Sequence, residues 1–300
     1  MTTRTLPTFT GPNLTGELQL SFTPHLIRRD LRVARVESIT PRYRRIVLGG
    51  ADLDDGFPFR RFTPADHVKV YFPHPDTGQI VAYRQVGEPE EDDWEVDVPG
   101  GEPIRRDYTV RGWDPEAKEL VLDFVVHDHG VAGVWAGRAG PGEEVVVMGP
   151  RANWLMPENY RHYLAFGDET ALPAISRIVE EAPAGTHVTA VIEVADAGEE
   201  QALVPAPGAT AELRWIHRDS ARVAEGHLSP LETAARSLEV SELGDVASLY
   251  VFAAGEAGAI KPIRRYLRRE LGLPKRQTHV DGYWKRGVTE HDHHVPEEDD

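Results

Sequence analysis

Apolar and polar positions alternate through the first half of the chain. In residues 62–73 (FTPADHVKVYFP) every second side chain from His67 onward is apolar, which is the period of a half-buried β-strand. Similar short runs occur within residues 31–50 and in the segments RRDYTVRGW, LVLDFVVHD and EEVVVMGP. Short strands separated by Gly and Pro turns favour a small antiparallel barrel. We therefore predict a β-barrel domain over residues 25–152, preceded by a loose, Thr- and Pro-rich extension over residues 1–24.

The pattern changes after Trp154. Buried strand-like runs (HYLAFGD, HVTAVIEVAD, AELRWIHR, SLYVFAAG) alternate with helical segments (ETALPAISRIVEEA, HLSPLETAARSLEV, AGAIKPIRRYLRREL). In the first helical segment Leu172, Ile175 and Ile178 recur three residues apart, as on one face of a helix. Strands that alternate with helices predict a doubly wound parallel sheet over residues 153–287. The fold class is thus a β-barrel followed by an α/β domain, with an acidic tail over residues 288–300.

Composition narrows the function. The 300 residues hold 33 Lys+Arg against 49 Asp+Glu, a net charge of −16, which argues against nucleic acid or an anionic membrane as a partner. The chain has no Cys, which excludes disulfides, thiol catalysis and cysteine-ligated clusters. It shows neither a signal-peptide core nor an apolar run near the roughly 20 residues that span a bilayer. We expect a soluble, cytoplasmic protein.

The acidity is concentrated. Residues 88–102 carry eight acids and no base, and we interpret them as a solvated loop. Residues 261–286 instead hold nine bases and two acids. Some of these bases lie on a helix beside a stripe of Ile and Leu, where a solvated face is the simplest interpretation. Metal binding by the tail, if any, is expected to be adventitious at His291, His293 and His294.

The segment Arg106-Asp107-Tyr108-Thr109-Val110-Arg111 lies on a predicted barrel strand. An Arg side chain offers a planar fork to phosphate oxygens, and Tyr offers an aromatic face to a flat ring. A Thr hydroxyl can reach a ring nitrogen. This combination suits a flavin dinucleotide, although an ordinary strand with an exposed Arg has the same letters.

Residues 127–150 run from a strand into a Gly-rich turn and a short helix of small residues. Gly130 and Gly133 would let the backbone approach a phosphate at the helix N-terminus. Trp135 would pack the helix onto the barrel, and His127 is more typical of a structural than of a catalytic histidine. A glycine-rich crossover without a ligand remains the alternative.

The segment Gly167-Asp168-Glu169-Thr170-Ala171 ends the first α/β strand, where doubly wound sheets bind ligands. A second turn, Ala254-Gly255-Glu256, is predicted at the same sheet edge. The G-x-G-x-x-G fingerprint is absent. Glu193 ends the next strand, where an acid suits a ribose 2′-hydroxyl and favours NADH, whereas Arg218 could reverse that preference.

Taken in order, R-x-Y-T-x-R, H-x-x-G-x-x-G-x-W-A, G-D-E-T-A-L-P-A-I, A-G-E and a terminal G-Y-W-K-R-G resemble the siderophore-interacting proteins. These are FAD-containing ferric-siderophore reductases of the ferredoxin–NADP reductase-like superfamily. The resemblance covers residues 28–287. It implies FAD in the barrel, NADH or NADPH as electron donor, and a ferric siderophore as substrate.

The resemblance and the residue patterns together suggest roles for individual residues, with Arg111, Glu193 and Lys69 taken from the residue patterns alone. The FAD site would comprise Arg106, Tyr108, Thr109, Arg111, His127, Gly130, Gly133, Trp135 and Ala136, with Tyr108 and Thr109 at the reacting ring. The nucleotide site would comprise Asp168, Glu169, Thr170, Ala171, Glu193, Gly255, Glu256 and Trp284. The substrate would contact Lys69, Lys285 and Arg286.

The predicted reaction is the reduction of iron(III) in a siderophore, which needs no acid or nucleophile on the protein. Three alternatives stay open: a general flavin reductase that serves another acceptor, a protein that binds siderophore without turnover, and a scaffold that binds no flavin. A monomer is the default expectation.

Overall fold

The computed structural model describes residues 11–23, 25–54, 56–88, 93–218, 228–238 and 245–288. The chain divides into two compact units. The barrel unit is built on Gln19–Leu155, and the sheet unit joins Pro12–Leu18 to the residues from Met156 onward. Each is described by itself.

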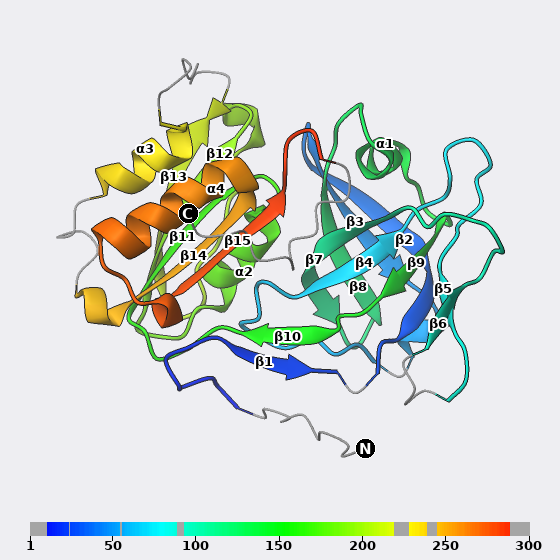
Figure 1. The fold of residues 1–300 in the computed structure, drawn as a ribbon, viewed down its shortest axis with the longest axis horizontal. Coiled ribbons are helices and arrows are strands. Elements are labelled where there is room, and N and C mark those ends of the chain that lie inside the picture. Colours follow the sequence, from blue (N-terminus) through cyan, green and yellow to red (C-terminus); the bar gives the residue numbers. More distant parts are fainter. Residues whose placement is uncertain are drawn as a thin grey trace. The chain divides into compact units, whose positions relative to one another are not determined.

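Six antiparallel strands close the barrel in the order β2-β3-β8-β7-β4-β9 (Figure 1). Their bounds are β2 Arg28–Thr40, β3 Tyr43–Gly49, β4 His67–Tyr71, β7 Arg105–Asp114, β8 Glu119–Val125 and β9 Glu144–Met148. The alternating pattern sends Val33, Leu48, Val70 and Leu122 into one core, where each is at most 2% exposed. The predicted barrel is confirmed.

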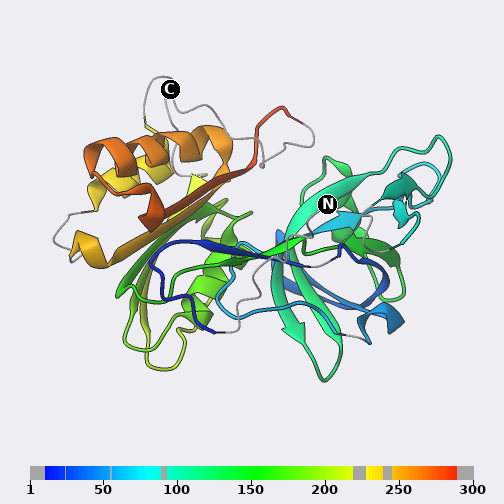
Figure 2. The same ribbon diagram turned by 60° about the horizontal axis from the view of Figure 1, so that its bottom comes forward.

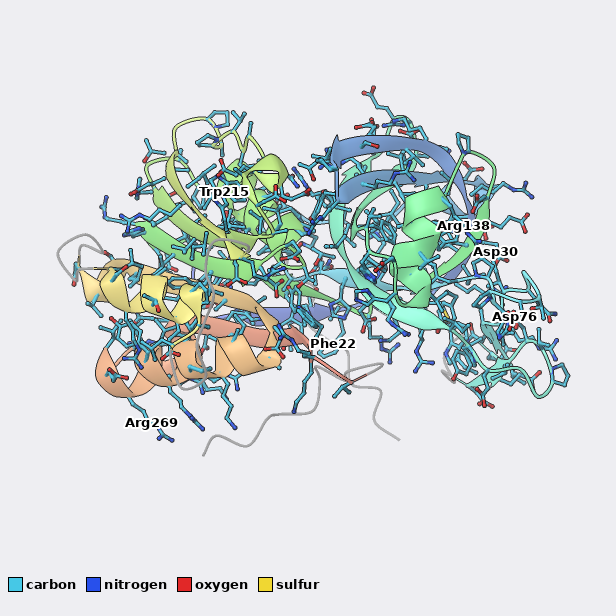
Figure 3. The ribbon with its side chains drawn as sticks, turned by 90° about the horizontal axis from the view of Figure 1, so that it is seen from above. Phe22, Asp30, Asp76, Arg138, Trp215 and Arg269 are labelled. Carbon is cyan, nitrogen blue, oxygen red and sulfur yellow. The ribbon has the colours of Figure 1, made fainter. Side chains whose placement is uncertain are left out.

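Helix α1 (Val131–Arg138) packs against the barrel, and Arg138 marks its end in Figure 3. The Trp135 ring on this helix is 1% exposed and lies 5.2 Å from Phe72 and 5.7 Å from Phe124, measured between ring centroids. The expected packing role of Trp135 is therefore confirmed.

Two strand ribbons of the barrel unit were not predicted. Strand β1 (Gln19–Phe22) pairs with β10 (Ala152–Leu155), so the interpretation of residues 1–24 as a loose extension is wrong at β1. Strand β5 (Tyr83–Gln85) pairs with β6 (Trp94–Val96), so the solvated loop expected over residues 88–102 is wrong at β6. Residues 89–92 of that segment lie outside the described residues.

The reason for the second correction lies in side-chain packing. Trp94 and Tyr83 join Tyr71 in a small apolar cluster outside the barrel core. Asp97 accepts hydrogen bonds from the Ala82 N–H (3.0 Å) and from the Arg28 guanidinium (2.6 Å). Because of these contacts, Trp94–Val96 forms a strand although acids flank it.

The sheet unit contains five parallel strands in the order β13-β12-β11-β14-β15. Their bounds are β11 His162–Asp168, β12 His187–Val194, β13 Thr210–His217, β14 Leu249–Glu256 and β15 Thr278–Trp284. Strand β15 was not predicted. The strand order reverses between β11 and β14, and such a switch point is where open α/β sheets bind ligands.

Helices cover both faces of this sheet. Helix α2 (Leu172–Glu181) packs on one face, whereas α3 (Pro230–Ser237) and α4 (Ala257–Arg265) pack on the other (Figures 1 and 2). The doubly wound fold is thus confirmed. Ser229 begins α3 by accepting a 3.1 Å hydrogen bond from the Glu232 N–H, and Pro230 occupies the first helical position.

Short turns complete the two units: 3₁₀ turns at Ala51–Leu53, Ala197–Glu199, Val246–Ser248 and Lys275–Gln277, and a π-helical turn at Tyr266–Glu270 that extends α4. Of the buried stripe expected for this helix, Ile260, Ile263 and Leu267 are buried, whereas Leu271 is only partly buried. Arg269 projects outward from the helix (Figure 3). Within the described ranges, no helix has the length and apolarity needed to cross a membrane.

Candidate functional site

Tyr108 lies on β7 opposite Val68 of β4, so the two side chains share the inner face of the barrel. The Tyr108 ring is half-buried against Phe124 (4.1 Å between centroids) and Phe72 (6.1 Å). Burial raises the pKa of its hydroxyl well above the ordinary value of 10. Tyr108 can therefore offer an aromatic face and a neutral hydroxyl, but it is no base at physiological pH.

Thr109 points to the opposite face of β7 and pairs with His67. It is 8% exposed, and its hydroxyl has no hydrogen-bond partner among the residues that the structure describes. The His67 Nδ1 atom lies 3.1 Å from the Ala65 carbonyl oxygen, which fixes Nδ1 as the protonated nitrogen when the ring is neutral. The Thr109 hydroxyl is thus available to a ligand.

The two arginines of the motif differ. The Arg106 Nη1 atom donates to the Arg105 carbonyl oxygen at 2.6 Å. The Arg111 Nε atom lies 3.5 Å from Asp123, a buried carboxylate that Arg45 also holds through two bonds of 2.8 and 2.9 Å. Arg111 therefore belongs to an ion cluster of the barrel, and its role toward FAD stays a prediction.

The Gly-rich turn before α1 has the features of a phosphate site. Gly130 has φ +72°, and no side chain caps the helix. A Cβ atom on Gly133 would lie 2.3–2.5 Å from the His127 ring, so only glycine allows the imidazole to rest on the helix. Ala136 is fully buried on the same helix.

His127 presents an unused nitrogen at this turn. Its Nδ1 atom is buried and lacks a partner within the described part of the chain. Burial lowers the pKa of the imidazole, with the neighbouring His129 acting in the same direction, so the ring is neutral at pH 7. An orphaned nitrogen beside an uncapped helix N-terminus fits the phosphate portion of a dinucleotide such as FAD.

In the sheet unit, one buried carboxylate joins three strand ends. Asp168 Oδ1 accepts bonds from the Thr170 N–H (2.9 Å) and hydroxyl (2.5 Å), whereas Oδ2 accepts from the Glu256 N–H (2.8 Å) and the Trp284 indole N–H (2.9 Å). Burial raises the pKa of Asp168, and the charge of Glu169 adds to the effect. The side chain expected to border the nucleotide is thus occupied by the protein, and no sequence signal revealed this hub.

Glycines permit the close approach around Asp168. A Cβ on Gly167 would lie 2.5 Å from the Ala171 Cβ atom and 2.8 Å from the Ala254 carbonyl oxygen. A Cβ on Gly255 would lie 2.8 Å from the Asp168 Oδ2 atom. The strand ends therefore pack closely around Asp168 at the switch point of the sheet.

The two helices at this edge start differently. Glu256 caps α4 by accepting a 2.9 Å bond from the Ala259 N–H and also accepts a 3.2 Å bond from the Arg286 N–H. Helix α2 begins after Ala171 without any side-chain cap. Pro173 has no N–H, so the first turn offers the N–H groups of Leu172 and Ala174, which suit the pyrophosphate of a nicotinamide nucleotide.

Glu169 and Glu193 both bind Arg218, which follows β13. The guanidinium makes two bonds to Glu169, one of them 2.9 Å long, and a 2.8 Å bond to Glu193. Together with its hydrogen bonds, the charge of Glu169 raises the pKa of Arg218 above its ordinary value. The sequence predicted Arg218 near this edge of the sheet, but it did not predict that Arg218 binds Glu169 and Glu193 together.

The predicted substrate residues fall in both units. Lys69 belongs to the barrel unit and is held by Asp107 at 2.8 and 3.0 Å, so this base is already paired. Lys285 and Arg286 belong to the sheet unit, where they are exposed directly after Trp284. Their roles stay predictions.

Comparisons with known proteins agree with this geometry. Residues 32–154 match the family model described as siderophore-interacting FAD-binding domain, and residues 160–287 match the model described as siderophore-interacting protein. An NADPH-dependent ferric-chelate reductase of Escherichia coli K12 is 32% identical over 272 residues, which cover 87% of this chain and 96% of the relative. A ferric vibriobactin reductase of Vibrio cholerae is 31% identical over 89% of this chain and 92% of its own.

Solved structures show the same arrangement of elements. A siderophore utilization protein from T. fusca aligns with a TM-score of 0.80 and 44% identity, covering 93% of this chain and all of its own. A ferredoxin NADP⁺ reductase from Neisseria gonorrhoeae aligns with a TM-score of 0.56 at 11% identity, covering 86% of this chain and 99% of its own. The fold is that of the ferredoxin–NADP reductase class. Within that class, the chain belongs to the siderophore-interacting protein family.

Proposed function

We propose that this protein is a reductase that passes electrons from a reduced nicotinamide nucleotide, through FAD, to the iron(III) of a siderophore. One observation carries the proposal: His127 Nδ1 is orphaned beside the uncapped start of α1. The uncapped start of α2 at a sheet switch point supports it. The names of two relatives, a ferric-chelate reductase and a ferric vibriobactin reductase, support the substrate class.

Bound FAD would supply the conversion of a two-electron donor into single electrons that iron accepts. The chain's own residues bind and orient FAD and the nucleotide. Tyr108 lends an aromatic face to the ring system. Thr109 lies on the opposite face of β7, so its role toward a ring nitrogen stays a prediction. The first turn of α1 and His127 hold a phosphate, and the first turn of α2 holds the phosphates of the nucleotide.

Product release follows from coordination chemistry. Iron(II) binds hard oxygen ligands less tightly than iron(III), so the chelate loosens after reduction. The reaction therefore requires no general acid or nucleophile. In the sheet unit Lys285 and Arg286 are the proposed attractors of an anionic ferric chelate, and in the barrel unit Lys69, held by Asp107, is the candidate.

Under this proposal residues 25–152 form the FAD-binding domain and residues 153–287 the nucleotide-binding domain. Residues 1–24 and 288–300 lie outside the chemistry. The protein acts as a monomer in the cytoplasm.

The test uses the visible spectrum of the purified full chain. We expect a yellow preparation whose flavin absorbance is bleached by NADH or NADPH in the absence of oxygen. Addition of a ferric catecholate should then restore the flavin absorbance, while an added iron(II) chelator develops its colour. A colourless preparation, or a flavin that the nucleotides do not bleach, would favour a binding protein or scaffold. Faster electron transfer to free flavin or a protein acceptor than to ferric chelates would favour a general flavin reductase.

A matched pair of variants tests the substrate residues. Lys285→Ala should weaken ferric-chelate binding several-fold while flavin content is unchanged. Arg276→Ala removes another exposed base of the same unit and should leave chelate binding as it is. Equal effects of the two substitutions would exclude a specific role for Lys285.

A further inference from the structure

Arg218 closes a clamp over the ends of two neighbouring strands. Its guanidinium binds Glu169, directly after β11, and Glu193, near the end of β12. Strand pairing sets this proximity, because Asp168 lies beside Glu193 and Glu193 lies beside Ile216 in the parallel register. With all three side chains ionised, two carboxylates face one cation and the clamp keeps a net charge of −1.

The clamp leaves one acceptor unused. Glu193 engages Arg218 through Oε1, and among the described residues its Oε2 atom has no hydrogen-bond partner. The Glu193 side chain is 14% exposed, so Oε2 can still be reached from the sheet edge. An acid at the end of the second strand is the position from which doubly wound folds bind the ribose of a dinucleotide.

Further acids surround the clamp. Asp196 begins the turn after β12, and Glu200 binds His217, the last residue of β13, at 2.7 Å. Neither touches Arg218. Among the described residues, the charge at this sheet edge therefore disfavours a group that brings two negative charges, such as the 2′-phosphate of NADPH.

We propose that Glu169 and Glu193 are specificity-determining residues: by holding Arg218 they make this enzyme select NADH over NADPH. This inference rests on the proposed function and names the nucleotide for that site. The ribose 2′-hydroxyl of NADH donates to Glu193 Oε2 and leaves the clamp intact. A 2′-phosphate can reach Arg218 only by displacing a carboxylate, which is then left unpaired beside the phosphate.

The main test compares kcat/KM for NADH and NADPH in the flavin-loaded enzyme. The wild type should prefer NADH by about tenfold or more. Glu169→Gln, which keeps the shape but removes the charge, should improve NADPH relative to NADH by about tenfold because Arg218 becomes available to the 2′-phosphate. Adding Arg218→Ala to Glu169→Gln should abolish that gain.

Glu200→Gln is the matched control. It removes one negative charge from the same sheet edge without touching Arg218, and it should change the nucleotide ratio by less than about twofold. If Glu200→Gln changed the nucleotide ratio as much as Glu169→Gln does, a general charge effect would explain the preference, and the proposal would be overturned. A wild type that prefers NADPH and loses this preference with Arg218→Ala would overturn it as well.

A binding measurement separates this inference from the proposed function. Calorimetry with ADP and with 2′,5′-ADP reports nucleotide selection even in a preparation that reduces no iron. The wild type should bind ADP more tightly, and Glu169→Gln should narrow the difference. Equal affinities in both proteins, or no binding of either probe, would contradict the clamp.

Discussion

The indole N–H of Trp284 donates a 2.9 Å hydrogen bond to Oδ2 of the buried Asp168 carboxylate. The two residues are 116 positions apart, and the bond joins the end of β15 to the end of β11. Lys285 and Arg286 follow Trp284 directly. One carboxylate therefore fixes both the turn expected to border the nucleotide and the strand end that presents two bases.

Replacing Trp284 by Phe tests this link. Phe keeps an aromatic ring but lacks the N–H, so Oδ2 retains only the Glu256 N–H. We expect a loss of about 1 kcal/mol in the free energy of unfolding and a several-fold rise in KM for the nucleotide. Trp215→Phe is the control, since this indole of β13 makes no hydrogen bond with the described residues. Equal KM values in the two variants would remove the positioning role of Trp284.

Stability should depend on pH through Asp281 on β15. Burial raises the pKa of this carboxyl from its ordinary 3.8 to about 6, against the opposing charge of Arg264. Between about pH 4 and pH 6 the folded protein keeps the proton that the unfolded chain releases, so this contribution to stability falls as pH rises through that window.

Asp281→Asn removes the dependence. The variant should be more stable than the wild type above pH 6, by at most about 3 kcal/mol, and the difference should vanish below about pH 4. Chemical unfolding at a series of pH values measures it. A difference that is constant with pH would contradict the assignment.

Gly133→Ala tests the phosphate turn. Alanine would favour the helix by about 1 kcal/mol, but its Cβ atom would lie 2.3 Å from the His127 ring and must displace it. We expect weaker retention of FAD, measured as flavin per protein after gel filtration. Gly140→Ala is the control, because open space surrounds Gly140. Unchanged flavin content in Gly133→Ala would mean that His127 does not serve the cofactor.

Substitutions of the paired residues Lys69 and Asp107 should change KM for the ferric chelate in opposite directions. Asp107→Asn should release Lys69 and lower KM for an anionic ferric chelate two- to threefold, whereas Lys69→Ala should raise it by about the same factor. Steady-state assays at low salt measure both. If neither variant changes KM, Lys69 has no part in substrate binding.

The barrel and the doubly wound sheet could be predicted because their strands and helices carry regular periods. Strand β6 could not, since Glu95 and Asp97 beside Trp94 have the composition of a loop. Its order comes from the contacts of Trp94 and Asp97 with distant residues. Strand β15 was missed because Thr278 and His279 are buried polar residues that break the apolar pattern.

The motifs identified the segments that form the candidate site, but they did not predict the contacts of the individual side chains. Asp168 was expected at the nucleotide, yet its oxygens bind Thr170, Glu256 and Trp284. This set of hydrogen bonds depends on which strands are neighbours in the sheet, and the spacing of residues within a motif does not reveal the strand order. The clamp on Arg218 depends on the register of three strands in the same way.

The most direct test of the account is a stoichiometric titration without oxygen. The flavin-loaded protein is reduced with a measured amount of NADH and then mixed with excess ferric catecholate and an iron(II) trap. Because a hydride carries two electrons and iron(III) accepts one, the account predicts two trapped iron(II) ions for each NADH oxidised, with full return of the flavin colour. A flavin that NADH reduces but that the ferric chelate leaves bleached, with no iron(II) trapped, would contradict it.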